Sequence, residues 1–148
     1  MPLTNCTTEL GAKSLTLDVP NEFEALERTR LAMRDFVAPL QLTPRVVYRL
    51  ELVLEEALMN RLRHAFPDGR RASTEVTLLV LPEGLLLRFE DDGIPFDPLQ
   101  AAAPRVASSI EEATVGGLGL PLTRKAASAC YYERLNGRNR FTVRLALA

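Results

Sequence analysis

The sequence contains few of the residues from which several common kinds of functional site are built. It has no tryptophan, two cysteines (Cys6 and Cys130) and one histidine (His64) among its 148 residues. Two cysteines are too few for a disulfide framework or a zinc site, so a reducing, cytoplasmic compartment is expected. With a single histidine, no convincing Ser–His–Asp or Cys–His set can be assembled. Disulfide scaffolds and hydrolases of these two types are therefore disfavoured.

Neither sign of charge dominates the chain, and long apolar runs are absent. Lys and Arg number 18 against 19 Asp and Glu, which gives a net charge of −1. Nucleic acid is not an expected partner, because basic runs and basic residues interleaved with aromatics are missing. The apolar runs are far shorter than a membrane span, and residues 1–5 lack the pattern of a signal peptide. No membrane association is expected.

The first half of the chain has the periodicities of one strand followed by two helices. Apolar and polar residues alternate over 13–19, as they do in a half-buried strand. A helix is predicted over 22–38. Thr43 and Pro44 have the pattern of an N-cap and a first-turn proline, and they predict a longer helix that reaches about residue 66.

The second half of the chain predicts two hairpins and a further helix. The stretches 74–81 and 85–90 alternate as paired antiparallel strands do, and Asn136-Gly137 is a strong turn signal between two later strands. The other predicted segments are a loosely ordered N-terminus over 1–12, a loop over 96–115, a helix over 118–129, and the strands 130–135 and 140–147.

This order of elements predicts a single α/β domain over residues 13–148. Hydrophobic residues make up 47% of the sequence and charged residues 25%, as in ordinary globular proteins. The chain is long enough to bury one continuous core. We expect a two-layer sandwich in which the helices cover one face of a largely antiparallel sheet.

A carboxylate and an amide lie close together on the second predicted helix. Glu56 and Asn60 are four residues apart, so their side chains are neighbours beside the apolar stripe of the helix. An exposed polar pair is the ordinary interpretation of this spacing. Against it, asparagine is a poor interior helix residue unless its amide has a partner. Such a pair at a pocket rim can hold Mg²⁺ and orient an attacking hydroxyl group or water.

An acidic stretch follows the strand predicted over 85–90. Continuing the alternation of this strand places Asp91 on the apolar face and turns Asp92 away from it. A carboxylate at the edge of a core needs a partner, and an amine such as that of adenine would serve. The run Asp91-Asp92-Gly93 followed by Pro95-Phe96-Asp97-Pro98 is equally typical of a turn. Both interpretations remain open.

A glycine-rich stretch precedes the helix predicted over 118–129. Gly116, Gly117 and Gly119 would let backbone amides approach a phosphate, and the start of a helix favours an anion. The spacing matches neither a P-loop nor a Rossmann fingerprint. Taken alone, such a loop is a weak signal for phosphate binding.

In their order, these three stretches resemble the motifs of the histidine-kinase-like (GHKL) ATPases, and most closely those of the anti-sigma serine kinases of bacterial partner-switching modules. The run from Leu52 to Asn60, followed by His64-Ala65-Phe66, resembles the family's N-box helix. The run from Asp91 to Pro98 resembles its first glycine box, and Gly116 to Leu120 resembles its second. The resemblance extends over nearly the whole chain, from about residue 13 to residue 147.

The resemblance implies a site for ATP and Mg²⁺. Asn60 would coordinate Mg²⁺, Glu56 would be the general base, and Asp91 would accept the adenine amine. Residues 96–115 would form a lid over the nucleotide. The remaining implied nucleotide-binding residues, several of them contacts to the phosphates, are Gly93, Asp97, Gly116, Gly117, Leu118, Gly119 and Leu120.

The resemblance also implies partners and leaves one alternative open. Proteins of this kind form homodimers, bind a sigma factor and phosphorylate a serine of a small antagonist protein. In this family the residue after the N-box asparagine is small, whereas here it is Arg61. Helical geometry turns Arg61 toward Ala57 and the apolar stripe, where it could pair with Asp91 or Asp97, reach a phosphate or the surface, or obstruct the adenine pocket. In the last case the domain would be a switch module with little or no ATP use.

Overall fold

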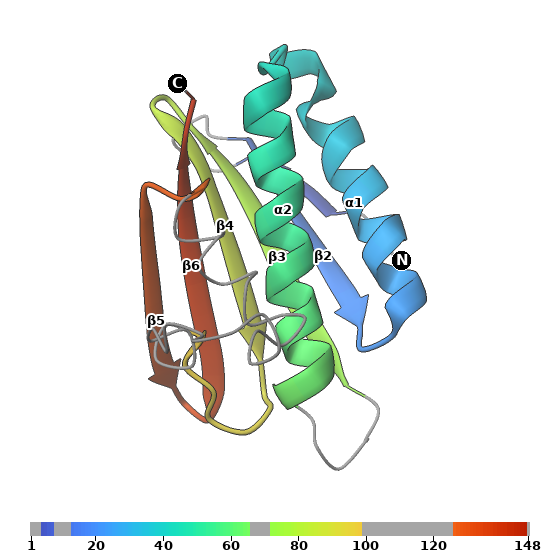
Figure 1. Ribbon diagram of the computed structural model, residues 1–148, viewed down its shortest axis with the longest axis vertical. Helices are drawn as coiled ribbons and strands as arrows, with labels where there is room; N and C mark the ends of the chain where they lie inside the picture. Colours follow the sequence, from blue (N-terminus) through green and yellow to red (C-terminus); the bar gives the residue numbers. More distant parts are fainter. Residues whose placement is uncertain (1–3, 8–12, 66–71, 99–125, 148) are drawn as a thin grey trace, which may run out of the picture.

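The protein is a two-layer sandwich of one sheet and two helices (Figure 1). The computed structural model describes residues 4–7, 13–65, 72–98 and 126–147. Within these residues the elements are β1 (Thr4–Thr7), β2 (Lys13–Pro20), α1 (Phe23–Val37), η1 (Ala38–Leu40), α2 (Pro44–Asn60), η2 (Arg61–Ala65), β3 (Ser73–Leu81), β4 (Gly84–Asp91), β5 (Ala129–Leu135) and β6 (Arg138–Ala146).

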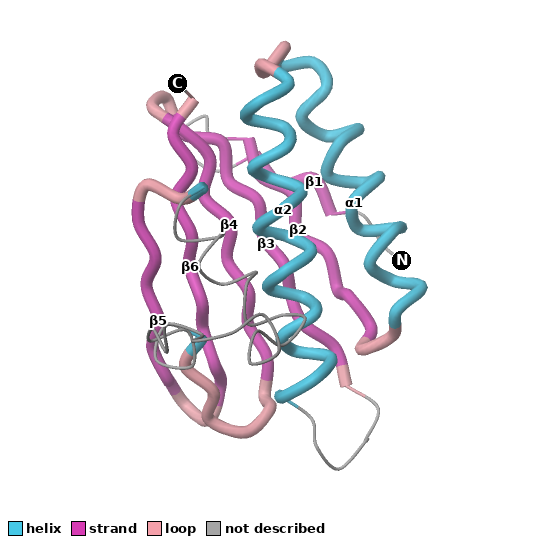
Figure 2. The backbone as a smooth tube through the Cα atoms, viewed as in Figure 1, coloured by secondary structure: helices cyan, strands magenta, loops and turns pink. Residues whose placement is uncertain are grey.

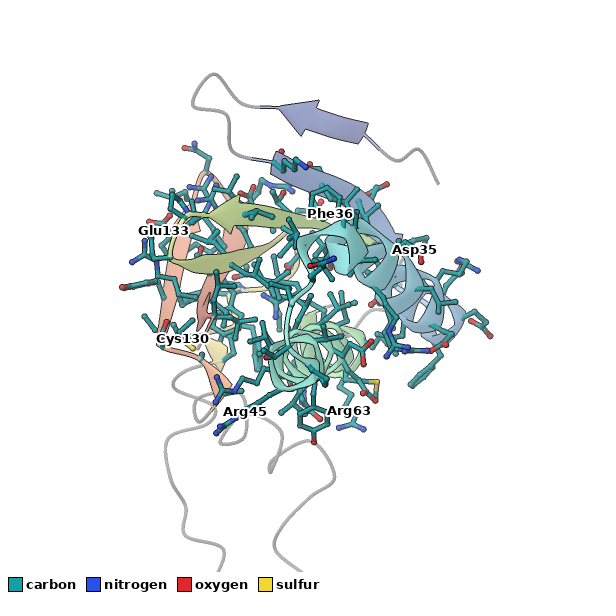
Figure 3. All side chains as sticks on the ribbon, turned by 90° about the horizontal axis from the view of Figure 1, so that it is seen from above. Asp35, Phe36, Arg45, Arg63, Cys130 and Glu133 are labelled. Carbon is teal, nitrogen blue, oxygen red and sulfur yellow. The ribbon has the colours of Figure 1, made fainter. Side chains whose placement is uncertain are left out.

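The six strands form one sheet in the order β1-β2-β3-β4-β6-β5, and every neighbouring pair is antiparallel. β1 and β5 are the two edges of the sheet, and β4 pairs directly with β6 although β5 lies between them in the sequence (Figure 2). Both long helices lie on the same face of the sheet, as the view from above shows (Figure 3). The predicted α/β fold class, with helices on one face of an antiparallel sheet, is confirmed.

The core lies between this face of the sheet and the inner sides of the helices. Alternate residues of the strands point into it, because side chains of a strand alternate between the two faces. The fully buried side chains include Leu17, Leu78, Leu87, Phe89, Phe141 and Val143 from the strands, and Met33, Val46, Leu50, Val53, Leu54 and Ala57 from the helices. The side of α2 turned away from the sheet carries the exposed residues Arg45, Tyr48 and Glu55, and Arg63, just beyond the end of α2, is also exposed (Figure 3).

The local signals for helix and turn act as expected. The Thr43 hydroxyl accepts a hydrogen bond from the Val46 backbone N–H at 3.3 Å, and Pro44 begins α2. Between β5 and β6, Asn136 and Gly137 have φ values of 52° and 76°. Positive φ at both central residues is the requirement of a type I′ hairpin turn, which Asn-Gly satisfies best.

The structure differs from the sequence prediction in three places. Loose order is predicted for residues 1–12, but residues 4–7 form β1, which pairs with β2 along the sheet edge. The helix predicted to reach residue 66 is α-helical only to Asn60 and continues as a π-helical turn to Ala65. A helix is predicted to continue to residue 129, yet residues 127 and 128 are not helical and β5 begins at Ala129.

Candidate functional site

The end of α2 and the end of β4 meet at one place. The Arg61 Nε atom lies 3.3 Å from Asp91 Oδ2, and the rings of His64 and Phe96 stack at 5.2 Å between centroids. Two of the three motifs singled out in the sequence are therefore neighbours in space. The third, residues 116–120, lies outside the described part of the chain, as does the predicted lid beyond residue 98.

Glu56 lies on α2, one helical turn before Asn60, and is half-buried. Burial raises the pKa of its carboxyl group above the ordinary value, and the charge of neighbouring Glu55 adds to the shift. The positive charge of Arg63 acts in the opposite direction. A carboxylate with a raised pKa is a better proton acceptor than an ordinary glutamate, which is a property that a general base requires.

Asn60 is the last residue of α2, and only 3% of its surface is exposed. Its side-chain nitrogen is buried with no hydrogen-bond partner among the described residues. A buried amide without partners costs free energy, so such groups commonly mark places where a polar ligand or water belongs. Asn60 therefore fits a position beside a polar ligand, and its amide oxygen is of the type that Mg²⁺ accepts.

Asp91 ends β4 and points into the core side of the sheet, while Asp92 is exposed. Only 1% of Asp91 is accessible, as the alternation from Phe89 predicts. Its Oδ1 atom accepts the Gly93 backbone N–H at 3.0 Å. The turn that the sequence offers as one interpretation is present, and the buried carboxylate itself closes it. The other interpretation, a ligand amine on Asp91, stays a prediction.

Asn139 is the main partner of this carboxylate, although none of the three sequence motifs contains it. Its Nδ2 atom donates to Asp91 Oδ1 and to the Ile94 carbonyl, both at 2.8 Å. Its Oδ1 atom accepts the Phe96 N–H at 3.2 Å. Asn139 is opposite Asp91 in the β4–β6 pair. Extending the alternation of β6 backward from Phe141 would have placed it on the same buried face.

Two side chains of β5 support the same loop. Arg134 Nη1 donates to the Gly93 carbonyl at 2.8 Å and to Asn139 Oδ1 at 3.0 Å. The Tyr132 hydroxyl donates to the same Asn139 oxygen at 2.5 Å. Arg134 is exposed, and its guanidinium holds the backbone of the predicted nucleotide loop.

Arg61 is buried in the core beside the site, with 2% of its surface exposed. Its guanidinium carbon lies 5.4 Å from the Phe89 ring centroid and 5.7 Å from that of Phe141. Nη1 donates to the Ala57 carbonyl at 3.3 Å. Burial lowers the pKa of Arg61, and the negative charge of Asp91 opposes that shift. Among the placements that the sequence leaves open, the structure shows the one beside Asp91.

The Arg61–Asp91 contact is an ion pair without good hydrogen-bond alignment. The two atoms are 3.3 Å apart, yet the Nε atom has no hydrogen-bond partner that satisfies the geometry. The distance is at the long end for a charged N–H···O⁻ contact, which is normally shorter than 3 Å or so. The guanidinium therefore lies beside the carboxylate without being held by it at full strength.

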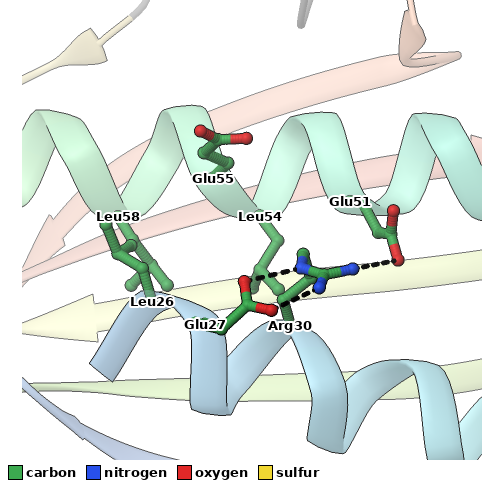
Figure 4. Close-up of a pocket in the computed structure, with 7 residues that line it drawn as sticks. All are labelled: Leu26, Glu27, Arg30, Glu51, Leu54, Glu55 and Leu58. Atoms are coloured by element: carbon green, nitrogen blue, oxygen red, sulfur yellow. Dashed lines mark hydrogen bonds and ion pairs between the residues drawn. The ribbon is translucent and has the colours of Figure 1, made fainter. Parts of the chain in front are cut away.

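A separate pocket lies between α1 and α2, and none of the predicted site residues lines it (Figure 4). Arg30 lies between Glu27 and Glu51 there, pairs with both, and is 3.3 Å from the Glu51 carboxylate. Leu26, Leu54 and Leu58 also line it. These charges link the two helices.

None of the described helices combines the length and apolar character needed to cross a membrane.

Comparison with known proteins identifies the family. Residues 19–146 match the histidine kinase-like ATPase domain. The chain is 35% identical over 113 residues to the serine/threonine-protein kinase BtrW of Bordetella bronchiseptica, covering 76% of each chain. It is 27% identical over 110 residues to the serine-protein kinase RsbW of Listeria monocytogenes, covering 72% of this chain and 70% of that one.

A solved structure has the same fold. One chain of the SiaB–SiaC complex from Pseudomonas aeruginosa is similar with a TM-score of 0.53 and 19% identity, over 88% of both chains. At that identity the likeness concerns the fold alone. The family that the motifs predict is confirmed by the sequence matches: the chain belongs to the histidine kinase-like ATPase family, among the protein serine/threonine kinases of that family.

Proposed function

We propose that this protein is an ATP-dependent serine kinase of a partner-switching system, which phosphorylates a small antagonist protein and binds a sigma factor. The observation that supports this most strongly is the meeting of the C-terminal end of α2 with β4, where Arg61, the residue after Asn60, lies 3.3 Å from the buried acid Asp91. The similarity to BtrW, a protein named as a serine/threonine kinase, supports the same reaction.

The proposed roles follow from the chemistry of each side chain. The Glu56 carboxylate accepts the proton of the acceptor serine hydroxyl, for which its raised pKa is suited. The Asn60 amide oxygen is a ligand for Mg²⁺, an ion that typically takes only one or two protein oxygens alongside phosphates and water. Asp91 accepts the adenine amine. Mg²⁺, when bound, neutralises charge on the phosphates, so the protein mainly positions the reacting groups.

The rest of the proposed site is assigned from the family pattern. Gly93 lies in the turn closed by Asp91, where it is buried and its carbonyl is held by Arg134. Asp97 is half-buried in the same loop. We assign the phosphates to Gly116, Gly117, Leu118, Gly119 and Leu120, and we assign the lid to residues 96–115. Homodimer formation is part of the same proposal.

Phosphotransfer with a matched pair of variants tests this proposal. The purified protein is mixed with Mg-ATP and the small antagonist protein encoded with it, and phosphoserine is measured by mass spectrometry. Glu56→Gln is compared with Glu55→Gln, because Glu55 is the adjacent, exposed carboxylate on the same helix. We expect transfer to fall at least about 100-fold in the Glu56 variant and to stay within about twofold of wild type in the other. Equal transfer in both would remove Glu56 from the mechanism.

A second candidate function is a switch module that binds its regulator without using ATP. The observation that favours it is the Arg61 guanidinium beside Asp91, at the atom that would meet the adenine amine. In that case the protein would bind the sigma factor in a pull-down equally well with and without nucleotide. It would also yield no phosphoserine under the conditions above.

A further inference from the structure

One of the two oxygens of the Asp91 carboxylate is already fully used by hydrogen bonds. Each carboxylate oxygen accepts about two hydrogen bonds. Oδ1 already accepts two, from the Gly93 N–H at 3.0 Å and from Asn139 Nδ2 at 2.8 Å. An incoming amine must therefore use Oδ2. That atom faces Arg61 Nε at 3.3 Å.

Arg61 is held in place by contacts other than Asp91. Its guanidinium lies over the Phe89 and Phe141 rings, where cation–π attraction operates, and it donates to the Ala57 carbonyl. The contact with Asp91 is the poorly aligned one, since Nε satisfies no hydrogen-bond geometry. The guanidinium can consequently leave Asp91 Oδ2 while it keeps its ring contacts and its bond to the helix.

We propose that Arg61 competes with the nucleotide base for Asp91 Oδ2, so that Arg61 sets the nucleotide affinity of the protein. In this arrangement the resting state has the guanidinium beside the carboxylate. Nucleotide binds only to the state in which Arg61 has withdrawn, and the observed affinity is reduced by the small fraction of that state. This inference rests on the proposed ATP site and adds a regulatory residue to it.

The competition predicts the direction in which a substitution acts. If Arg61 instead helped to bind the base or the phosphates, its removal would weaken binding. Because it occupies the acceptor atom, its removal strengthens binding. Arg61→Met is the informative change, since the thioether chain keeps apolar volume over Phe89 and Phe141. It removes the competing donor together with the positive charge and the hydrogen bond to the Ala57 carbonyl.

The experiment measures Mg-ADP binding by titration calorimetry for wild type, Arg61→Met and Arg63→Met. Arg63→Met is the matched control, because it removes the same charge from an exposed position two residues away. We expect the dissociation constant of Arg61→Met to be at least ten times lower than that of wild type. The control is expected to stay within twofold. Equal or weaker binding by folded Arg61→Met overturns the inference.

A measurement on the wild-type protein covers the case in which the variant does not fold. The Nε–H resonance of Arg61 is followed by nuclear magnetic resonance during saturation with Mg-ADP. A shift of this resonance larger than that of exposed arginines is expected, and an unchanged resonance at saturation overturns the inference. If the proposed kinase function is wrong, the outcome differs from the one that overturns this inference. Neither wild type nor Arg61→Met would then bind Mg-ADP, and no phosphoserine would form.

Discussion

Replacing Asn139 with alanine should be among the most destabilising single changes in this protein. The Asn139 side chain makes five hydrogen bonds to described residues, two as a donor and three as an acceptor. It is 1% exposed, so water cannot readily replace it. The change would leave the buried Asp91 carboxylate short of a partner, together with the part-buried Ile94 carbonyl and Phe96 N–H.

The magnitude follows from the kinds of bond that are lost. A neutral hydrogen bond contributes about 1 kcal/mol net, and one to an ionised group about 1.5–3 kcal/mol. Two of the five involve the charged side chains Asp91 and Arg134. Partial solvation of Tyr132 and Arg134 reduces the sum, because those two groups can turn to water. We therefore expect a loss of about 3–5 kcal/mol in the free energy of unfolding.

Equilibrium unfolding in urea, followed by circular dichroism, measures this loss. A decrease of this size corresponds to a fall of roughly 10–15 °C in the melting temperature of a domain of this length. Tyr132→Phe is the matched control, since it removes one of the five bonds and should cost about 1 kcal/mol. If Asn139→Ala unfolds within about 1 kcal/mol of wild type, the network contributes little and the loop is held in another way.

Three further outcomes are expected. Thr43→Ala removes the N-cap of α2 and should cost about 1 kcal/mol in urea unfolding, whereas Thr43→Ser should cost little. Gly84→Ala puts a Cβ atom 2.3 Å from the Leu145 carbonyl oxygen, so this variant should unfold far more readily than Gly137→Ala, whose Cβ meets no atom within 4 Å. The raised pKa of Glu56 stabilises the fold below the ordinary glutamate pKa, and this contribution disappears as pH rises through the raised value. The unfolding free energy of wild type minus that of Glu56→Gln should therefore decrease as the pH rises. The phosphotransfer rate should increase over the same pH interval. A difference in unfolding free energy that does not change with pH would contradict the raised pKa of Glu56.

Features set by neighbouring residues could be predicted from the sequence. The helix start at Thr43-Pro44 and the turn at Asn136-Gly137 depend on local backbone preferences, and both are present. The inward direction of Asp91 follows from two-residue alternation along β4, which needs no knowledge of the rest of the fold. By contrast, β1 has only four residues and is held at a sheet edge by pairing with β2, so it has too little length for a periodic pattern.

The partners of Asp91 could not be predicted in the same way. Asn139 lies 48 residues further along the chain and reaches Asp91 only because β4 and β6 are adjacent in the sheet. That adjacency is a property of strand order, which hydrophobic periodicity does not contain. The position of Arg61 on the buried stripe follows from helix geometry, but the choice of Asp91 as its partner depends on where β4 ends.

The opposition of Asp91 and Asn139 constrains how the gene can change over evolutionary time. When a strand gains or loses one residue, its two faces are exchanged, so the Glu90 side chain would point inward in place of the Asp91 side chain. Amino-acid replacements that keep the backbone conformation of the β3–β4 and β5–β6 turns leave the pairing intact, whereas a single insertion or deletion inside β4 or β6 does not. Homologues that keep the site should therefore vary in the composition of these hairpins, apart from Gly84 and the positive-φ pair Asn136-Gly137, while their strand lengths stay fixed.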